Sequence, residues 1–207
     1  MIENLKKIPL VIVGLVIMSL GIVLYLKSGL GANPLTVFTE GTSKVLGISV
    51  GRASQFIMFS LIIIVFFVDR KRLGLGTIIH AILVGFLMDV FMEWNWLNPE
   101  SMISAYIILG LGVFLFGVGL ALYVCAGLGE GPIDALMIIL HLRLKKDIKW
   151  VRIVMDLCLI IIGFLLGGHV GIGTIIGVVF TGPIIENTLK LIKNQSLFKL
   201  IRKKEVI

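Results

Sequence analysis

Two glycine-rich segments that end in proline carry the residues of this chain best suited to binding a ligand. They are Gly29-Leu30-Gly31-Ala32-Asn33-Pro34-Leu35-Thr36 and, 98 positions later, Gly127-Leu128-Gly129-Glu130-Gly131-Pro132-Ile133-Asp134. Glycine permits close backbone approach and proline suits the first turn of a helix, so each segment should open a helix whose first N–H groups need partners. Such breaks at equivalent points of two halves indicate the central site of a transporter. The candidate ligand-binding residues are Gly29, Gly31, Asn33, Pro34, Thr36, Gly127, Gly129, Glu130, Gly131, Pro132 and Asp134.

The same segments are also explained by tight turns that bind nothing, with Asn33 or Asp134 capping the helix that follows. The two copies differ in charge, since Glu130 and Asp134 stand where the first copy has Ala32 and Thr36. Carboxylates near a helix N-terminus occupy the place that an anion would take. The second segment therefore favours a cation, an amine or a proton.

Four further ionisable residues lie in or beside apolar runs and are candidates for coupling or gating: Arg152, Asp156, Asp89 and Glu186. Charged groups at membrane depth are costly and are functional candidates by default. Arg152 and Asp156 are four residues apart, so they can pair along one helix. Asp89 and Glu186 occupy matched positions in the two halves, and Asp89 is also explained as an acid at a helix end.

No constellation typical of an enzyme is present. The chain has no G-x-S-x-G elbow, H-E-x-x-H motif, phosphate loop or dinucleotide fingerprint. His80 and His169 have no ligand partner at helical spacing, and we expect both to be structural. We therefore expect no catalytic residue, no metal and no cofactor.

Composition indicates that membrane helices position these residues. The chain is 58% apolar and 15% charged, with a mean hydropathy of +1.09, whereas about a quarter of residues are charged in soluble proteins. Apolar runs of about the 20 residues needed to cross a bilayer lie at 8–26, 50–68, 75–92, 102–126, 151–166 and 172–189. Basic residues, which give a net charge of +7, lie between these runs, as in cytoplasmic loops. The pattern predicts an all-α polytopic protein whose partner is the lipid bilayer, and it excludes nucleic-acid binding.

The chain contains an internal repeat. An offset of 98 pairs Gly14, Gly21 and Tyr25 with Gly112, Gly119 and Tyr123, and an offset of 97 pairs residues 74–79 with 171–176. We expect membrane repeat 1 at 1–98, membrane repeat 2 at 99–193 and a basic amphipathic tail at 194–207. Each repeat should contain three full transmembrane helices and one short broken or re-entrant helix, at 34–46 or 132–144. Each short helix is about 20 Å long, too short for a bilayer core of about 30 Å.

Topology depends on these short helices. If they do not cross, the repeats are inverted (3+3), both termini are cytoplasmic, and 16 basic residues lie inside against three outside. If they cross, the repeats are parallel (4+4) and the counts are 15 and four. We expect the inverted arrangement, because the second short helix ends in the basic residues 143–146.

We expect the repeated glycines and the aromatic residues at the ends of the apolar runs to have structural roles. Glycines spaced seven apart let membrane helices approach closely, so we expect packing at these positions. Tyr25, Tyr123, Trp94 and Trp96 lie at the ends of apolar runs and suggest an aromatic belt. The tail mixes apolar and basic residues and should bind anionic headgroups. A homodimer is a further expectation.

The repeated Gly-Leu-Gly-x-x-Pro segment, followed in each half by a Gly-x-Gly-Thr helix, resembles the YczE/YyaS/YitT family of bacterial membrane proteins. The resemblance covers roughly residues 8–190 and is most specific at 127–134, at Arg152 with Asp156, and at 167–174. Asn33 and Thr36 depart from the pattern, which argues against two equal sites. The long branch of the family carries a soluble C-terminal domain that this chain lacks, so it resembles the short, YczE-like members. The resemblance implies a multi-pass protein of the bacterial inner membrane and supplies no reaction.

Two functions fit these observations. The first is a small-solute secondary transporter or permease, with its unknown solute at the two breaks and with Asp134, Glu130 and Asp156 coupling a cation or proton. The second is a non-transporting scaffold that supports another membrane assembly through glycine-lined faces. A polar cavity reaching the breaks favours the first, and tightly packed breaks without a cavity favour the second.

Overall fold

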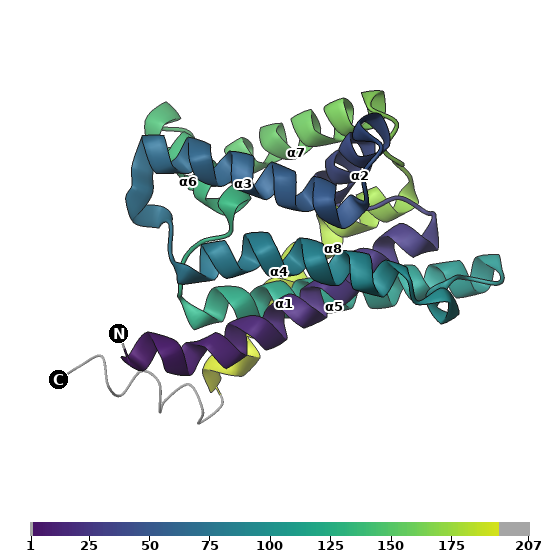
Figure 1. The fold of residues 1–207 in the computed structure, drawn as a ribbon, viewed down its shortest axis with the longest axis horizontal. Coiled ribbons are helices and arrows are strands. Elements are labelled where there is room, and N and C mark those ends of the chain that lie inside the picture. The colour runs from purple at the N-terminus through teal and green to yellow at the C-terminus, as the bar shows by residue number, and fades with distance from the viewer. Residues whose placement is uncertain (1, 195–207) are drawn as a thin grey trace.

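A computed structural model describes residues 2–194. Over this range all regular secondary structure is helical, and loops join the helices (Figure 1). Two helices are short and begin at the prolines of the glycine breaks, as predicted: α2 (Pro34–Leu46) and α6 (Pro132–Leu144). The longer helices are α1 (Ile2–Ser28), α3 (Val50–Asp69), α4 (Leu75–Met92), α5 (Met102–Ala126), α7 (Ile148–Leu165) and α8 (Ile172–Asn194). Single 3-10 turns follow α3 and α4, at η1 (Arg70–Arg72) and η2 (Asn95–Leu97). The headgroup-binding tail that the sequence predicts lies outside the described residues, apart from Asn194.

Five helices are long and apolar enough to cross a membrane, and they contain Lys7–Ser28, Val50–Arg72, Leu75–Met92, Met102–Ala126 and Ile172–Ile192. This helix content is that of a multi-pass membrane protein. The sequence predicts α7 as a sixth span. It has 18 residues, but Lys149, Arg152 and Asp156 interrupt its apolar character. Its composition alone therefore does not mark it as a span.

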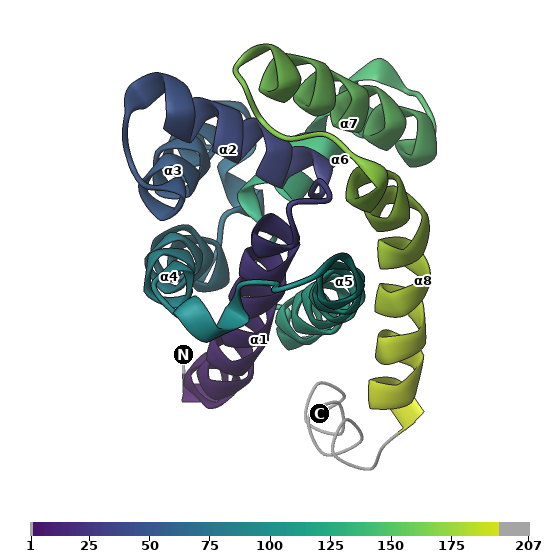
Figure 2. The same cartoon turned by 90° about the vertical axis from the view of Figure 1, so that its right-hand side faces the viewer.

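Helices α1 and α5 cross at the centre of the molecule and run in opposite directions (Figures 1 and 2). At Gly14, an added Cβ would lie 2.9 Å from the Gly119 carbonyl oxygen, and at Gly21 it would lie 2.9 Å from the Gly112 carbonyl oxygen. Only glycine lets the two backbones approach this closely. The prediction that these glycines pack helices together is confirmed.

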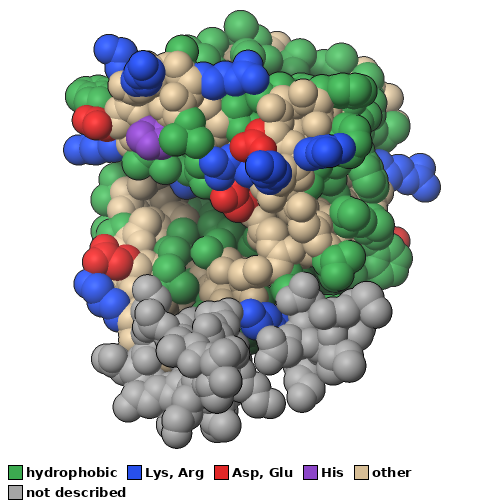
Figure 3. Space-filling view, turned by 90° about the vertical axis from the view of Figure 1, so that its left-hand side faces the viewer, with side chains coloured by type: hydrophobic (Ala, Val, Ile, Leu, Met, Phe, Trp, Pro, Cys, Tyr) green, Lys and Arg blue, Asp and Glu red, His purple; other side chains and the backbone are tan. Residues whose placement is uncertain are grey.

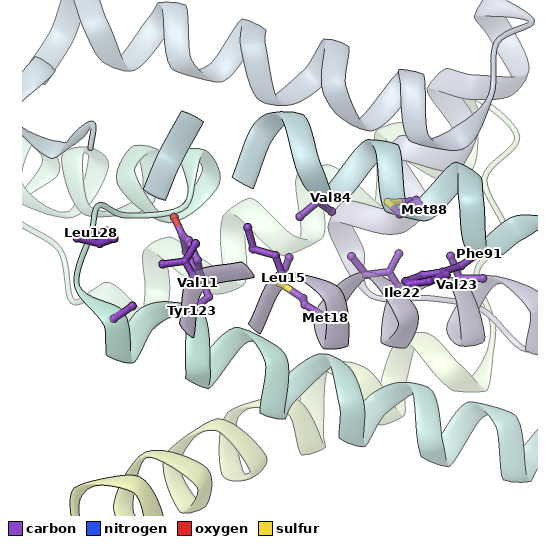
Figure 4. Close-up of a cluster of buried hydrophobic side chains, with 11 residues drawn as sticks. Val11, Leu15, Met18, Ile22, Val23, Val84, Met88, Phe91, Tyr123 and Leu128 are labelled. Atoms are coloured by element: carbon purple, nitrogen blue, oxygen red, sulfur yellow. The ribbon is translucent and has the colours of Figure 1, made fainter. Parts of the chain in front are cut away.

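The largest apolar core fills the space between α1, α4 and α5 (Figure 4). Tyr123 is buried in it, with its ring centroid 5.2 Å from that of His80, and Tyr25 is completely buried edge-on to Phe116. The belt prediction was therefore wrong for both tyrosines, because their helices cross at the centre of the molecule. Trp94 and Trp96 are exposed, as a belt requires.

Each glycine break packs against the start of a helix from the other half of the chain. The Gly76 amide donates a 2.8 Å hydrogen bond to the Leu128 carbonyl, and the Gly173 amide donates one of 2.7 Å to the Leu30 carbonyl. At Gly31, φ is +98° and an added Cβ would lie 2.5 Å from the Gly171 nitrogen, so a larger residue would be strained and would clash. The breaks thus fix the starts of α4 and α8.

The helices share two ends. At the left of Figure 1, α1, α4 and α7 begin and α3, α5 and α8 end, with α6 nearby. At the right, where α2 lies, α3, α5 and α8 begin and α1, α4 and α7 end. The two short helices therefore lie at opposite ends of the bundle.

Candidate functional site

A cavity of about 530 Å³ lies at the centre of the described chain, and each of its eight α-helices contributes to the lining. Much of the wall is apolar, with contributions from Met18, Met58, Phe116 and Leu159. Figure 3 views the end of the molecule where α1 begins and shows it hollowed, with apolar side chains inside and charged side chains around the hollow. The polar lining residues come mainly from the starts of α2 and α6 and from α7.

The cavity continues between α7 and α8. One face of α7, including Asp156 and Leu159, and one face of α8, including Thr181 and Ile185, both line it. The two helices meet through the loop 166–171 and diverge from there (Figures 1 and 2), and they are not among the closely packed helix pairs. We call this part of the cavity wall, where α7 and α8 separate, the α7/α8 seam.

At the start of α2, Asn33 has two roles. Its Oδ1 accepts a 3.0 Å hydrogen bond from the Thr36 amide, so the capping interpretation is correct here. Its Nδ2 is buried and has no hydrogen-bond partner among the described residues, and Asn33 lines the cavity. A buried amide donor left unpaired costs about 1–3 kcal/mol. A ligand oxygen in the cavity would remove that cost.

At the start of α6, an acid replaces the cap. The N-cap is Gly131, and no side chain within the described range caps this helix. Asp134 lies in the first turn and lines the cavity, as do Arg152 and Asp156. The Arg152 Nη1 is 4.0 Å from the Asp134 Oδ1, and the Arg152 Nε is 3.5 Å from the Asp156 Oδ2. One guanidinium is thus shared by two carboxylates, and the predicted pairing along α7 is confirmed.

The surroundings of Asp134 raise the pKa of its carboxyl. Burial raises the pKa of its carboxyl above the ordinary value, Arg152 opposes this, and Glu130 and Asp156 add to it. Both contacts to Arg152 are longer than a normal hydrogen bond of 2.7–3.2 Å. The carboxylates therefore retain unused acceptor capacity towards the cavity.

Glu130 lies outside this cavity. Its carboxylate pairs with Arg72 at 3.1 Å, and its backbone carbonyl accepts a 2.7 Å hydrogen bond from the Thr77 hydroxyl. These contacts tie the second break to the η1 turn and to α4. The structure therefore separates the two acids that the sequence grouped as ligand-binding.

Asp89 and Glu186, matched in sequence, have different surroundings, and neither lines the cavity. Asp89 accepts a 2.6 Å hydrogen bond from the Ser49 hydroxyl and one of 2.8 Å from the Gly51 amide, at the start of α3. Glu186 is exposed and pairs with Lys190 at 2.6 Å. Their assignment to coupling gains no support from these positions.

The glycines of the breaks lie beside the cavity and do not line it. Gly29 and Gly31 line a second, smaller cavity of about 240 Å³, with Glu40 and His169. Gly127, Gly129, Gly131 and Pro132 line neither cavity. Of the eleven residues predicted to bind a ligand, those in the central cavity are Asn33, Pro34, Thr36 and Asp134.

His80, for which the sequence predicts a structural role, is also part of the cavity wall. It is 7% exposed, lines the cavity, and its Nδ1 has no hydrogen-bond partner among the described residues. A single histidine in an apolar run offers no spacing signal. The repeat register did offer a signal. At an offset of 97, His80 corresponds to Gly177 in the second half, and both residues line the cavity.

Two side chains of α2, Glu40 and Lys44, form a polar latch onto the loop between α7 and α8. The Lys44 Nζ contacts Glu40 at 2.6 Å and donates a 2.8 Å hydrogen bond to the Gly167 carbonyl. Glu40 also accepts a 2.8 Å hydrogen bond from the His169 amide. These contacts hold the loop between α7 and α8 onto α2.

Comparison with known proteins places the chain among proteins without an assigned activity. The family described as "Family of unknown function (DUF6198)" matches residues 5–190. An uncharacterized protein of Haemophilus influenzae is 32% identical, covering 90% of this chain and 85% of that protein. In Bacillus subtilis, the uncharacterized protein YyaS is 30% identical (90% of this chain, 94% of YyaS) and the uncharacterized membrane protein YczE is 31% identical (85% and 82%). The predicted family resemblance is confirmed. No solved structure matches the chain significantly.

Proposed function

The chain belongs to the family of unknown function DUF6198 and is similar to YyaS and to the membrane protein YczE, and we propose that it is a small-solute transporter or permease. Its solute occupies the central cavity. The proposal assigns no chemical reaction to the chain.

One observation carries the proposal: the first turns of both short helices contribute to one cavity. Asn33 and Thr36 reach it from α2, and Asp134 reaches it from α6. A volume of about 530 Å³ lies within the range of about 300–1,000 Å³ typical of small-molecule sites. Turns that served only to reverse the chain would need neither a shared cavity nor the unpaired amide donor of Asn33.

We propose inverted repeats, at 1–98 and 99–193, as the framework for alternating access. The antiparallel crossing of α1 and α5 supports this, since corresponding helices of parallel repeats would run the same way. The paired hydrogen bonds Gly76 to Leu128 and Gly173 to Leu30 support it further, because they are related by the repeat offsets. Inverted repeats that rock about a central site are a common transporter design.

The two repeats differ in one respect that fits transport. Helices α3 and α4 pack closely, with Gly51 against Gly85, while the corresponding α7 and α8 diverge. The seam widens towards the end that carries the basic residues 70–72 and 143–149, which we place in the cytoplasm of a bacterial inner membrane together with both termini. At the opposite end, hydrogen bonds from Lys44 to the Gly167 carbonyl and from the His169 amide to Glu40 hold the α7–α8 loop onto α2. We assign this conformation to the inward-facing state of the proposed cycle.

A scaffold acting through glycine-lined faces has less support. The faces that contain Gly14, Gly21, Gly112 and Gly119 are consumed by the contact between α1 and α5. Gly173 in turn packs against the first break. These faces are not free to bind a partner.

Filling the cavity tests the proposal. Gly182 on α8 lines the cavity, and a Cβ added there would meet nothing within 4 Å in the described chain. Gly110 on α5 has the same open space and lies outside the cavity, so it is the matched control. The wild-type, Gly182→Leu and Gly110→Leu proteins are placed in liposomes with a pooled metabolite mixture, and the lumen is analysed by mass spectrometry.

We expect at least one metabolite to accumulate with wild-type and Gly110→Leu proteins and not with Gly182→Leu. Equal accumulation with Gly182→Leu would contradict the cavity as the route. No accumulation above empty liposomes with any protein would leave the scaffold as the better explanation.

A further inference from the structure

We infer that the solute is an amphipathic amine, with an apolar body and one protonated amino group, and that it reaches the cavity from the bilayer through the α7/α8 seam. The inference takes the location of the site from the proposed function and adds the chemical class of the ligand and its route.

The apolar body follows from the cavity wall. Methionine, leucine and phenylalanine side chains from α1, α3, α4, α5 and α7 face the space, including Met18, Met58, Met88 and Phe116. Flexible methionines adapt to ligands of varied shape. A ligand of polar atoms alone would lose hydrogen bonds to water along this wall without replacing them.

The amino group follows from the charge balance at the polar side of the cavity. Asp134 and Asp156 face it with two carboxylates, and Arg152 offers one guanidinium at 4.0 and 3.5 Å. Lys149 also lines the cavity, but it is exposed in the first turn of α7, where its long side chain can reach water. Arg152 is shared between the two carboxylates, so a protonated amine supplies a further positive charge and N–H donors to their free acceptor positions.

A second polar contact is available elsewhere in the cavity wall. The unpaired Asn33 Nδ2 and His80 Nδ1 both belong to residues that line the cavity and are nine-tenths buried. Asn33 can donate to an oxygen of the ligand. A hydroxyl or carbonyl between the apolar body and the amine would satisfy it.

The seam supplies the route. Val178 and Gly182 of α8 line the cavity, Val178 is 54% exposed, and open space surrounds Gly182. The outer surfaces on both sides of the seam are apolar, with Ile161, Phe164 and Val179 exposed. A molecule leaving the cavity sideways therefore meets lipid, where an amphipathic solute partitions.

Binding of dansylcadaverine, a fluorescent amphipathic primary amine, tests the inference. The full chain is placed in lipid nanodiscs, and fluorescence is titrated against empty nanodiscs. N-acetylated dansylcadaverine has nearly the same shape without the charge, and dansyl-6-aminohexanoic acid carries the opposite charge. We expect saturable binding of the amine only, with Kd raised about tenfold or more for the acetylated probe.

Variants locate the amine. Asp134→Asn should raise the Kd of the amine about tenfold or more, whereas Asp134→Glu should retain binding. Glu186→Gln changes an exposed acid outside the cavity and should leave Kd unchanged. If Asp134→Asn does not fold, the comparison of the three probes on the wild-type protein still decides the question. Equal binding of the amine and its acetylated form, or preferred binding of the acid, would overturn the inference.

The route has its own test. Val178→Trp should slow probe association at least severalfold when the probe is added in lipid vesicles. Unchanged association would exclude the seam as the entrance.

The inference and the proposed function fail separately. Binding of the amine without metabolite accumulation in liposomes would keep the ligand class and reject transport. Accumulation of an anionic or fully polar metabolite, blocked by Gly182→Leu, would keep transport and reject the amine.

Discussion

Arg72 and Glu130 form an ion pair across 58 residues of sequence, with 3.1 Å between the Arg72 Nη1 and the Glu130 Oε1. The pair turns Glu130 away from the cavity that Asp134 lines. The two acids of the second break therefore have separable roles, one joining helices and one facing the site.

Neutralising each acid should separate these roles. We expect Glu130→Gln to lower stability by about 1 kcal/mol or less, because both partners are partly exposed, and to leave probe binding intact. Asp134→Asn should raise the Kd of the amine about tenfold or more, with little loss of thermal stability. Unfolding temperatures in detergent and dansylcadaverine titrations measure the two effects. Loss of binding in Glu130→Gln alone would reverse the assignment.

Amine binding should weaken on acidification. The carboxylate of Asp134 attracts the amine, and its protonation removes that attraction, while an alkylamine stays protonated below a pH of about 10. Since burial raises the pKa of Asp134, the affinity should begin to fall at a pH above the ordinary carboxyl pKa of about 3.9. Titrations across this range measure the midpoint, and Asp134→Asn should flatten the curve. A midpoint at or below the ordinary value would contradict the burial of this acid.

The α1–α5 crossing should not tolerate a methyl group. Gly21→Ala places a Cβ against the Gly112 carbonyl and the Phe116 amide, both on α5, so the helices must separate. We expect the free energy of unfolding to fall by about 1–3 kcal/mol or more, as it does when extra methyl groups are forced into a well-packed core. Gly110→Ala is the control, because it has open space and gains helix propensity of up to about 1 kcal/mol. Equal unfolding temperatures for the two variants would show that the contact is looser than described.

Asn33 should show its two roles when substituted. Asn33→Ala removes the cap and should cost about 1 kcal/mol of stability. Asn33→Ser keeps a capping oxygen and lacks the amide donor that lines the cavity, so it should retain stability and bind an oxygen-bearing amine several-fold more weakly. If Asn33→Ser binds as tightly as wild type, the residue is a cap alone.

Inverted repeats predict labelling from opposite sides at matched positions. Gly29 and Gly127 are equivalent, both are exposed, and both have positive φ with nothing within 4 Å of an added Cβ in the described chain. Gly29→Cys and Gly127→Cys should therefore be matched in strain, in a background with Cys125 and Cys158 replaced by alanine. A membrane-impermeant maleimide should label Gly127→Cys from the cytoplasm and Gly29→Cys from outside. Labelling from the same side would establish parallel repeats.

Local and periodic signals in the sequence were enough to predict much of the fold. The proline at the end of each glycine break set the starts of α2 and α6, at Pro34 and Pro132, since proline acts on the backbone within one or two positions of itself. Spacing along one helix paired Arg152 with Asp156. Hydropathy identified a membrane protein, because bilayer thickness dictates the length of an apolar run.

Only the tertiary structure decided which polar groups face one another. Glu130 and Asp134 are four residues apart, yet one pairs with η1 and the other lines the cavity, because different helices surround them. The same reason buries Tyr25 and Tyr123 and brings His80 to the cavity from α4. The seam between α7 and α8 has no sequence signal, since it depends on how far apart the two helices lie in the folded chain. The sequence thus determines where the helices begin and end, and their packing determines the site.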